Sequence, residues 1–218
     1  MIILNSNLFI DKISLNRDKI NSFDEYPFNI EIIKDFNELN FAEPVTFFIG
    51  ENGTGKSTFL EAIAIAMGLN AEGGTQNFNF VTKNTSSSLS NYLKISRHNY
   101  PENKFFLRAE SFYNFSSEMQ RLVEEDHYFS LYKYYGGNLH NCSHGESFIK
   151  LVKNRFGDNG LYILDEPEAA LSPERQMTLL CLIDDLVKRG SQFIIATHSP
   201  ILISYYKGVI LDLDNNFK

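Results

Sequence analysis

The chain has 218 residues, of which 43% are hydrophobic and 22% are charged, proportions that are ordinary for a water-soluble globular protein. Its formal net charge of −7 disfavours a dedicated nucleic-acid binder, although an acidic average would also hide a local basic groove. No apolar run is as long as a membrane span, the N-terminus lacks the basic region of a signal peptide, and two cysteines give no disulfide framework. We therefore expect one cytoplasmic domain.

Residues 1–43 are predicted to form short strands and turns. Leu8–Ile10 and Ile13–Leu15 are apolar enough to pair with each other, and Phe28–Ile32 starts a further element. Three side chains in this region are of the kinds that stack on adenine in many nucleotide sites: Arg17, Tyr26 and Phe28. Aromatic packing and a solvated arginine are the favoured interpretation of all three.

The strongest functional signal is Gly50–Ser57, which matches the P-loop pattern G-x-x-x-x-G-K-[ST]. Val45–Ile49 before it is β-branched and aromatic, which predicts a buried strand. The apolar run Ser57–Met67 after it predicts a helix that ends at Gly68. The residues expected to bind the nucleotide are Gly50, Glu51, Asn52, Gly53, Thr54, Gly55, Lys56, Ser57 and Thr58.

The chemistry of a P-loop explains why it uses these residue types. Glycines let the backbone turn so that successive N–H groups point at phosphate oxygens, and the helix N-terminus adds a partial positive charge. Lys56 is expected to be an exposed loop side chain that reaches the β- and γ-phosphates, and the Ser57 hydroxyl is the expected Mg²⁺ ligand. The motif therefore predicts binding of a nucleoside triphosphate.

The middle of the chain gives weaker signals. Residues 69–91 are rich in Asn, Ser, Thr and Gly, which predicts a long loop. Lys104–Ser111 is the next predicted strand, and a helix is expected around Ser116–Glu125.

Ser143, followed by Glu146 and an apolar run, forms a capping-box pattern that starts a helix. With Gly145 at the exposed edge of this helix start, Ser143 and Gly145 form a second candidate anion site. An ordinary cap without a ligand is the favoured interpretation if the motif is taken alone. Three residues of types that bind metals alternate along the chain just before and inside this motif, namely His140, Cys142 and His144. No plausible fourth ligand accompanies them, which disfavours a zinc site.

Leu161–Leu164 predicts a buried strand that ends in Asp165 and Glu166. An aspartate at this place is the Walker B residue that holds Mg²⁺ in P-loop enzymes, because a parallel sheet brings both motifs to its carboxyl edge. Glu166 would face the same pocket, where it can accept the proton of an attacking water.

Ser172 and Pro173 begin a long predicted helix that ends at Gly190. Gln192–Thr197 is the next buried strand, and it places His198 at its carboxyl end, where a histidine beside a nucleotide site is a candidate functional residue. Gly208–Leu213 is the last predicted strand.

Taken together, these residues resemble an ABC-type ATPase head, and most closely the small stand-alone ATPases often described as AAA family, which group near RecF, SMC and OLD-type heads. The resemblance covers about residues 44–199. Its motifs are Walker A at Gly50–Ser57, the signature at Ser143–Ser147, Walker B at Leu161–Asp165, the D-loop at Ala169–Ser172 and the switch histidine, His198.

The resemblance implies an α/β fold in a single domain, residues 1–218. A P-loop core sheet of ABC-ATPase type would carry an antiparallel N-terminal portion and a small helical subdomain around residues 112–157. The sequence departs from the family pattern at His144 and Glu146, which replace a glycine and the glutamine of the signature. Glu110 or Ser111 stands where the Q-loop glutamine would be, so Glu110 is a further candidate Mg²⁺ ligand.

The implied function is Mg²⁺-dependent ATP binding and hydrolysis, with Glu166 as the catalytic base and His198 stabilising the γ-phosphate. The resemblance also implies an ATP-induced head-to-tail homodimer, in which Ser143 and Gly145 contact the nucleotide of the opposite subunit, and action on an unknown protein partner. Two alternatives stay open, namely the nucleotide-binding subunit of a membrane transporter and a DNA-associated or defence-system ATPase.

Overall fold

A computed structural model describes residues 8–71, 87–109, 112, 143–215 and 217. The α-helices of this part of the chain are α1 (Glu31–Asp35), α2 (Lys56–Ala66), α5 (His144–Arg155), α6 (Pro173–Lys188) and α7 (Pro200–Ile203). The 3-10 helices are η1 (Arg17–Lys19), η2 (Ser88–Tyr92) and η4 (Pro167–Ala170). The strands are β1 (Lys12–Leu15), β2 (Glu38–Asn40), β3 (Val45–Ile49), β4 (Leu93–Ser96), β5 (Asn103–Arg108), β6 (Gly160–Asp165), β7 (Gln192–Ala196) and β8 (Gly208–Asp212).

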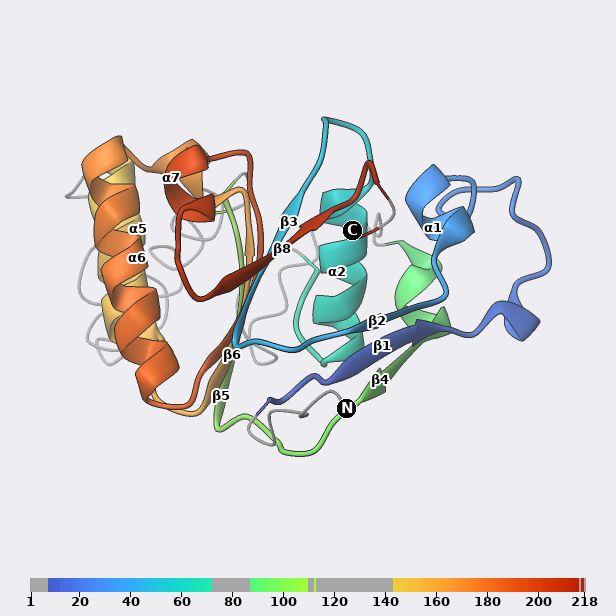
Figure 1. The fold of residues 1–218 in the computed structure, drawn as a ribbon, viewed down its shortest axis with the longest axis horizontal. Coiled ribbons are helices and arrows are strands. Elements are labelled where there is room, and N and C mark those ends of the chain that lie inside the picture. Colours follow the sequence, from blue (N-terminus) through green and yellow to red (C-terminus); the bar gives the residue numbers. More distant parts are fainter. Residues whose placement is uncertain (1–7, 72–86, 110–111, 113–142, 216, 218) are drawn as a thin grey trace, which may run out of the picture.

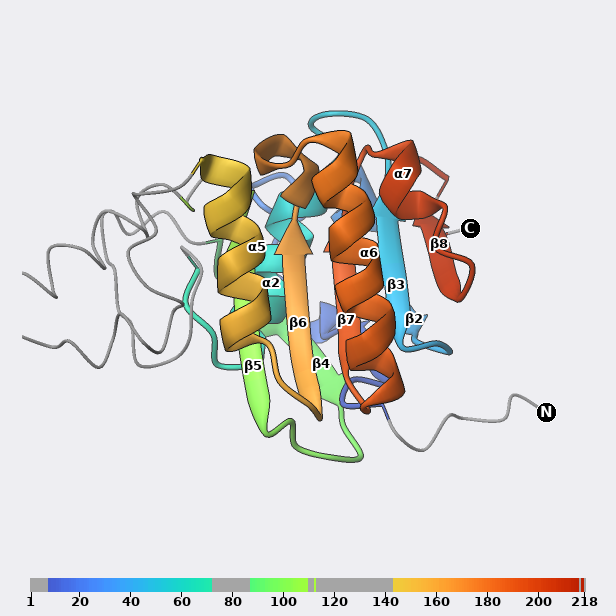
Figure 2. The same ribbon diagram turned by 90° about the vertical axis from the view of Figure 1, so that its left-hand side faces the viewer.

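The centre of the fold is a five-stranded parallel sheet in the order β5-β6-β7-β3-β8. Helices α5, α6 and α7 cover one face of this sheet, and α2 covers the other (Figures 1 and 2). Strand β6 is buried along its whole length, and its side chains alternate between the two layers. Leu161 and Ile163 pack in the core on the α2 side, whereas Tyr162 and Leu164 pack in the core on the α5 and α6 side.

A second, antiparallel sheet of three strands lies beside α2 in the order β2-β1-β4 (Figure 1). Ile13 at the centre of β1 pairs with Leu39 of β2 and with Ile95 of β4, and it is fully buried. The expected α/β fold, with a parallel P-loop sheet and an antiparallel N-terminal portion, is therefore confirmed.

The predicted pairing of residues 8–10 with residues 13–15 is wrong. The backbone N–H groups of Phe9 and Ile10 both donate to Oε1 of Gln192, each at 2.9 Å, and the Gln192 amide donates to the Ile10 carbonyl at 3.0 Å. One buried glutamine of β7 thus satisfies the backbone groups that a partner strand would have paired.

Two predicted helix starts are confirmed, but neither uses the predicted side-chain cap. Ser143 and Ser172 stand at the N-caps of α5 and α6, and neither side chain makes a capping hydrogen bond. Pro173, whose ring already fixes a helical φ, opens α6. In α5 the buried apolar face holds the helix against α6 and η4 instead.

Strand β5 ends at Arg108, so the predicted strand over residues 104–111 is shorter than expected at its C-terminal end. The helix expected around residues 116–125 and most of the expected helical subdomain lie outside the described residues, as do residues 72–86 of the long loop. No described helix combines the length and the apolar character needed to cross a bilayer.

Candidate nucleotide-binding site

The P-loop connects the carboxyl end of β3 to the N-terminus of α2, as the sequence predicts. Gly53 has a φ of +87° and Gly55, the N-cap of α2, has a φ of +99°, conformations that residues with a Cβ rarely adopt. A Cβ on Gly55 would also lie 2.8 Å from Cγ2 of Ile30. The loop is therefore shaped by its glycines and packed closely against the residues that lead into α1.

Lys56 does not extend into solvent as expected, since only 4% of the residue is exposed. Its Nζ donates to the carbonyl oxygens of Gly50 and Glu51, both at 2.8 Å, so the side chain folds back into its own loop. Burial lowers the pKa of the Lys56 ammonium, and nearby carboxylates, Glu166 first and then Asp214, act in the opposite direction. The loop backbone thus holds the ammonium group of Lys56 in place.

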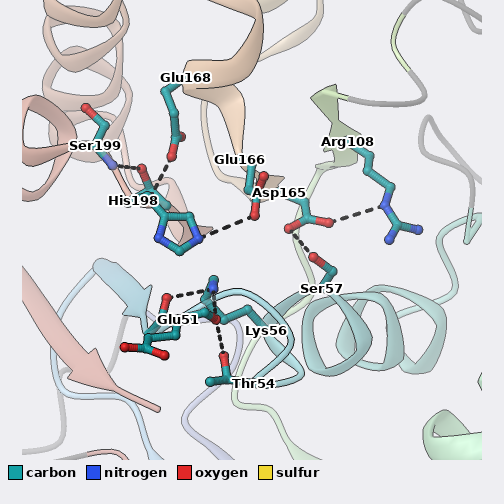
Figure 3. A network of polar contacts seen from close by, with 12 residues as sticks. Glu51, Thr54, Lys56, Ser57, Arg108, Asp165, Glu166, Glu168, His198 and Ser199 are labelled. Carbon is teal, nitrogen blue, oxygen red and sulfur yellow. Dashed lines mark hydrogen bonds and ion pairs between the residues drawn. The ribbon is translucent and has the colours of Figure 1, made fainter. Parts of the chain in front are cut away.

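The end of β6 brings Asp165 to the first turn of α2. The Ser57 hydroxyl donates to Oδ1 of Asp165 at 3.0 Å, and Asp165 is 4% exposed (Figure 3). A hydroxyl and a carboxylate oxygen are hard ligands of the kind that Mg²⁺ prefers, and Mg²⁺ commonly completes its shell with waters and phosphate oxygens. The residues present therefore fit this ion.

Arg108, the last residue of β5, is a site residue that the sequence motifs do not indicate. Its Nε lies 3.2 Å from Oδ2 of Asp165, and its Nη1 donates to Glu61 of α2 at 2.9 Å. Oε1 of the same glutamate accepts the backbone N–H of Ser87 at 3.1 Å. The only sequence signal was the place of Arg108 at the end of a strand that neighbours β6.

Glu166 and His198 are brought together by the ends of β6 and β7. Nε2 of His198 lies 3.6 Å from Oε1 of Glu166, and Glu166 has a φ of +49°, an uncommon conformation for a glutamate. Oε1 of Glu168 accepts the backbone N–H of His198 at 2.6 Å (Figure 3). These side chains line a hollow of about 570 Å³ together with the tip of the P-loop, Glu51 and Asn52.

Gly145 is buried, contrary to the expectation that it lies at an exposed edge. A Cβ there would lie 2.8 Å from the Ala170 carbonyl oxygen and 3.0 Å from Arg175, because α5 packs closely against η4 and α6. Ser143 is exposed. Within this chain, the start of α5 therefore presents Ser143, rather than Gly145, to solvent.

The three upstream candidates for adenine stacking have different environments. Arg17 donates to the carbonyls of Lys34 and Phe36 and lies over the Phe23 ring. Phe28 is buried, as the packing interpretation predicts. Tyr26 is 62% exposed, and its hydroxyl lies 3.4 Å from that of Thr58, one residue after the P-loop motif.

A second hollow of about 670 Å³ adjoins the P-loop. It is lined by the residues leading into α1, by Glu51–Thr54 and by Leu213 and Asp214 after β8. Glu110, the further candidate Mg²⁺ ligand, lies outside the described residues, as do His140 and Cys142.

A family model described as AAA domain matches residues 19–141, more than half of the chain. The chain belongs to the AAA domain family. A second model, described as AAA ATPase domain, matches residues 139–203, the part that carries Asp165, Glu166 and His198. This AAA-domain chain is thus a nucleotide-binding protein of the ATPase type, and the expected membership of the AAA-type ATPases is confirmed.

Solved structures of similar fold have low sequence identity to the AAA-domain chain. The SMC head domain from Thermotoga maritima is 17% identical over 94% of each chain, with a TM-score of 0.48. A putative metal-chelate type ABC transporter is 16% identical over 84% of this chain and 74% of its own, with a TM-score of 0.47. A dimeric bacterial ABC transporter cassette is 15% identical over 82% and 86%, with a TM-score of 0.43. No curated protein sequence matches the chain.

Proposed function

We propose that this chain binds ATP together with Mg²⁺ at Gly50–Ser57 and hydrolyses it. The observation that supports this proposal most strongly is the contact between Ser57 and Asp165, because it joins the phosphate-binding loop and a buried carboxylate in one oxygen-lined site. Mg²⁺ bound there would neutralise charge on the phosphates. The loop amides and Lys56 would hold the β- and γ-phosphates.

Glu166 is the proposed base. It follows the Walker B aspartate and lines the hollow beside the P-loop tip, where a water could lie next to the terminal phosphate. His198, 3.6 Å from Glu166, would donate to the γ-phosphate from the same side. Glu168 supports this arrangement, because it holds the backbone N–H of His198. The residues proposed to bind the phosphates, to activate the water and to donate to the γ-phosphate therefore follow the ends of three neighbouring strands, β3, β6 and β7.

The proposed active form is a head-to-tail homodimer that assembles around two ATP molecules and acts as a switch or clamp on a protein partner. The exposed Ser143 supports this arrangement, since the N-terminus of a twelve-residue helix offers N–H groups and a partial positive charge. The described polar contacts of the P-loop do not involve Ser143, which suits a role toward the nucleotide of a second copy.

Calorimetry with ATP in Mg²⁺ and in a chelator, combined with phosphate-release assays, tests the enzymatic part. We expect saturable binding of one ATP per chain that weakens without Mg²⁺, and slow hydrolysis. Absence of binding at millimolar ATP would overturn the assignment. Light scattering on Glu166→Gln in ATP and Mg²⁺ tests the dimer separately, because a protein that binds ATP and stays monomeric contradicts only the dimeric form.

A further inference from the structure

The turn after β8 is held tightly against the core sheet. The Leu213 N–H donates to the Ile49 carbonyl of β3 at 2.9 Å, and the Leu213 side chain is buried. Asp212 accepts the backbone N–H of Asp214 at 3.0 Å and the Asn215 amide at 2.7 Å. Residues 212–215 therefore form a fixed turn beside the point where β3 enters the P-loop.

An aromatic contact further anchors this turn to α2. The Phe217 N–H donates to the Asp212 carbonyl at 2.7 Å. Its ring centroid lies 5.5 Å from that of Phe59 in α2 and 5.3 Å from that of Phe36. The helix that carries Lys56 and the turn that carries Asp214 thus share one cluster of rings.

Asp214 uses this fixed position to contact the P-loop backbone. Its Oδ2 accepts the N–H of Glu51 at 2.8 Å, and its Oδ1 would lie 3.3 Å from a Cβ on Gly50. The carbonyl of Glu51 in turn accepts a hydrogen bond from Nζ of Lys56 at 2.8 Å. Asp214 is therefore two hydrogen bonds away from the ammonium group that would hold the phosphates.

We propose that Asp214 is a positioning residue of the P-loop: its carboxylate fixes the first turn of the loop and thereby the phosphate-binding cation, while its negative charge weakens triphosphate binding. This inference rests on the proposed ATP-binding function. The two effects have opposite signs, and they can be separated because an asparagine keeps an oxygen acceptor at the same position without the charge. The geometry thus predicts that ATP affinity is highest with asparagine at position 214, lower in the wild type and lowest with alanine. Neither effect alone would give this order.

The experiment compares Asp214→Asn, Asp214→Ala and the wild-type chain by calorimetry with ATP and Mg²⁺. Asp214→Asn should bind ATP about threefold more tightly, because it removes a like charge near the phosphates at moderate salt. Asp214→Ala should bind about tenfold more weakly, because the Glu51 N–H loses its acceptor. Asp185→Ala, which removes an exposed carboxylate of α6, is the matched control and should leave the affinity unchanged.

Amide hydrogen exchange of Glu51 in the nucleotide-free proteins gives a second readout. Exchange should be faster in Asp214→Ala than in wild type and close to wild type in Asp214→Asn. Unchanged exchange in Asp214→Ala, or an alanine variant that binds ATP as tightly as wild type, would overturn the positioning role. If wild type binds no ATP, the proposed function fails, and the exchange measurement still decides whether Asp214 fixes the loop.

Discussion

The Ser57 hydroxyl donates to Oδ1 of Asp165 at 3.0 Å although 108 positions separate the two residues in the chain. The other oxygen of the same carboxylate lies 3.2 Å from Nε of Arg108, so the carboxylate is held from both sides. This orientation leaves Oδ1 directed at the first turn of α2, where the proposed Mg²⁺ would lie next to the phosphates.

The first prediction concerns this carboxylate. Asp165→Asn should lose most of the Mg²⁺-dependent part of ATP affinity, a weakening of about 10- to 100-fold, because a neutral amide replaces an anionic ligand or its water partner. ATP titrations with Mg²⁺ and with a chelator measure this part directly. An equal weakening under both conditions would instead indicate damage to the loop.

Lys56→Ala should weaken ATP binding by at least about 100-fold, because the charged hydrogen bonds to the phosphates are lost. The variant should still fold, with some loss of stability, since the alanine leaves the carbonyls of Gly50 and Glu51 without their donor. Calorimetry gives the affinity and circular dichroism the fold.

Lys104 provides a matched control for the second prediction. It is partly buried and donates to the Met67 carbonyl at 2.6 Å, and burial lowers its pKa as it does that of Lys56. Lys104→Ala should therefore reduce the melting temperature and leave ATP affinity near the wild-type value. Similar losses of affinity in both variants would contradict a specific role for Lys56.

Glu166→Gln should bind ATP and Mg²⁺ normally and hydrolyse ATP about 10²- to 10⁴-fold more slowly, because the amide keeps the shape of the side chain and loses the proton acceptor. Single-turnover phosphate release measures the chemical step. Turnover within a few-fold of wild type would remove Glu166 as the base and direct attention to His198 or Glu110.

Ser143→Arg should leave the ATP affinity of a single chain nearly unchanged and prevent ATP-dependent dimerisation, and with it hydrolysis. The substituted residue lies at an exposed helix start outside the described P-loop contacts. Light scattering on a Glu166→Gln background reads out the dimer, and calorimetry reads out the binding.

Mixing Ser143→Arg with Lys56→Ala, both otherwise wild type, sharpens this test. In a mixed dimer one composite site carries both substitutions, while the other pairs an intact P-loop with an intact Ser143. Partial recovery of hydrolysis on mixing is the expected result. A mixture no more active than its components would contradict the shared site.

The last prediction concerns the pH dependence of stability and a residue that lies away from the site. Asp184 of α6 contacts Lys188, Tyr205 and Lys207, and the hydrogen bond from Lys188 is the main cause that lowers its pKa from 3.8 to about 2. Because the folded-state value is the lower one, the stabilisation is present above about pH 4 and is lost as the pH falls toward 2.

Asp184→Asn should therefore melt at a lower temperature than wild type at pH 7, and the difference should shrink as the pH is lowered from 4 to 3. Asp185→Asn is the control, since Asp185 is exposed and its carboxylate lies 3.8 Å from Nζ of Lys188, farther away than the carboxylate of Asp184 at 2.7 Å. A difference that does not depend on pH would contradict the electrostatic explanation.

The sequence predicted the parts of this molecule that depend on local pattern. The P-loop, the strand that ends in Asp165 and the long helix from Pro173 follow from periodicity, glycine placement and apolar runs. Arg108 could not be identified in this way, since its contacts with Glu61 and Asp165 arise only when separate elements assemble. The burial of Lys56 was missed for the same reason.

A long-range contact of one side-chain amide explains why the pairing predicted for Leu8–Ile10 is wrong. An apolar segment such as Leu8–Ile10 looks like a strand that needs a neighbouring strand. Its backbone partner is instead the Gln192 side chain, which nothing near residue 8 could reveal.

The contact between Gln192 and the N-terminal segment also has a consequence for biosynthesis. Phe9 and Ile10 lie 183 and 182 positions before the side chain that holds them. A ribosome that adds about 5 to 20 residues per second therefore leaves this apolar segment without its partner for roughly 10 to 40 seconds. This segment thus reaches its native contacts only after β7 has been made, and substitutions at Gln192 should lower stability because they leave buried backbone groups of Phe9 and Ile10 without partners.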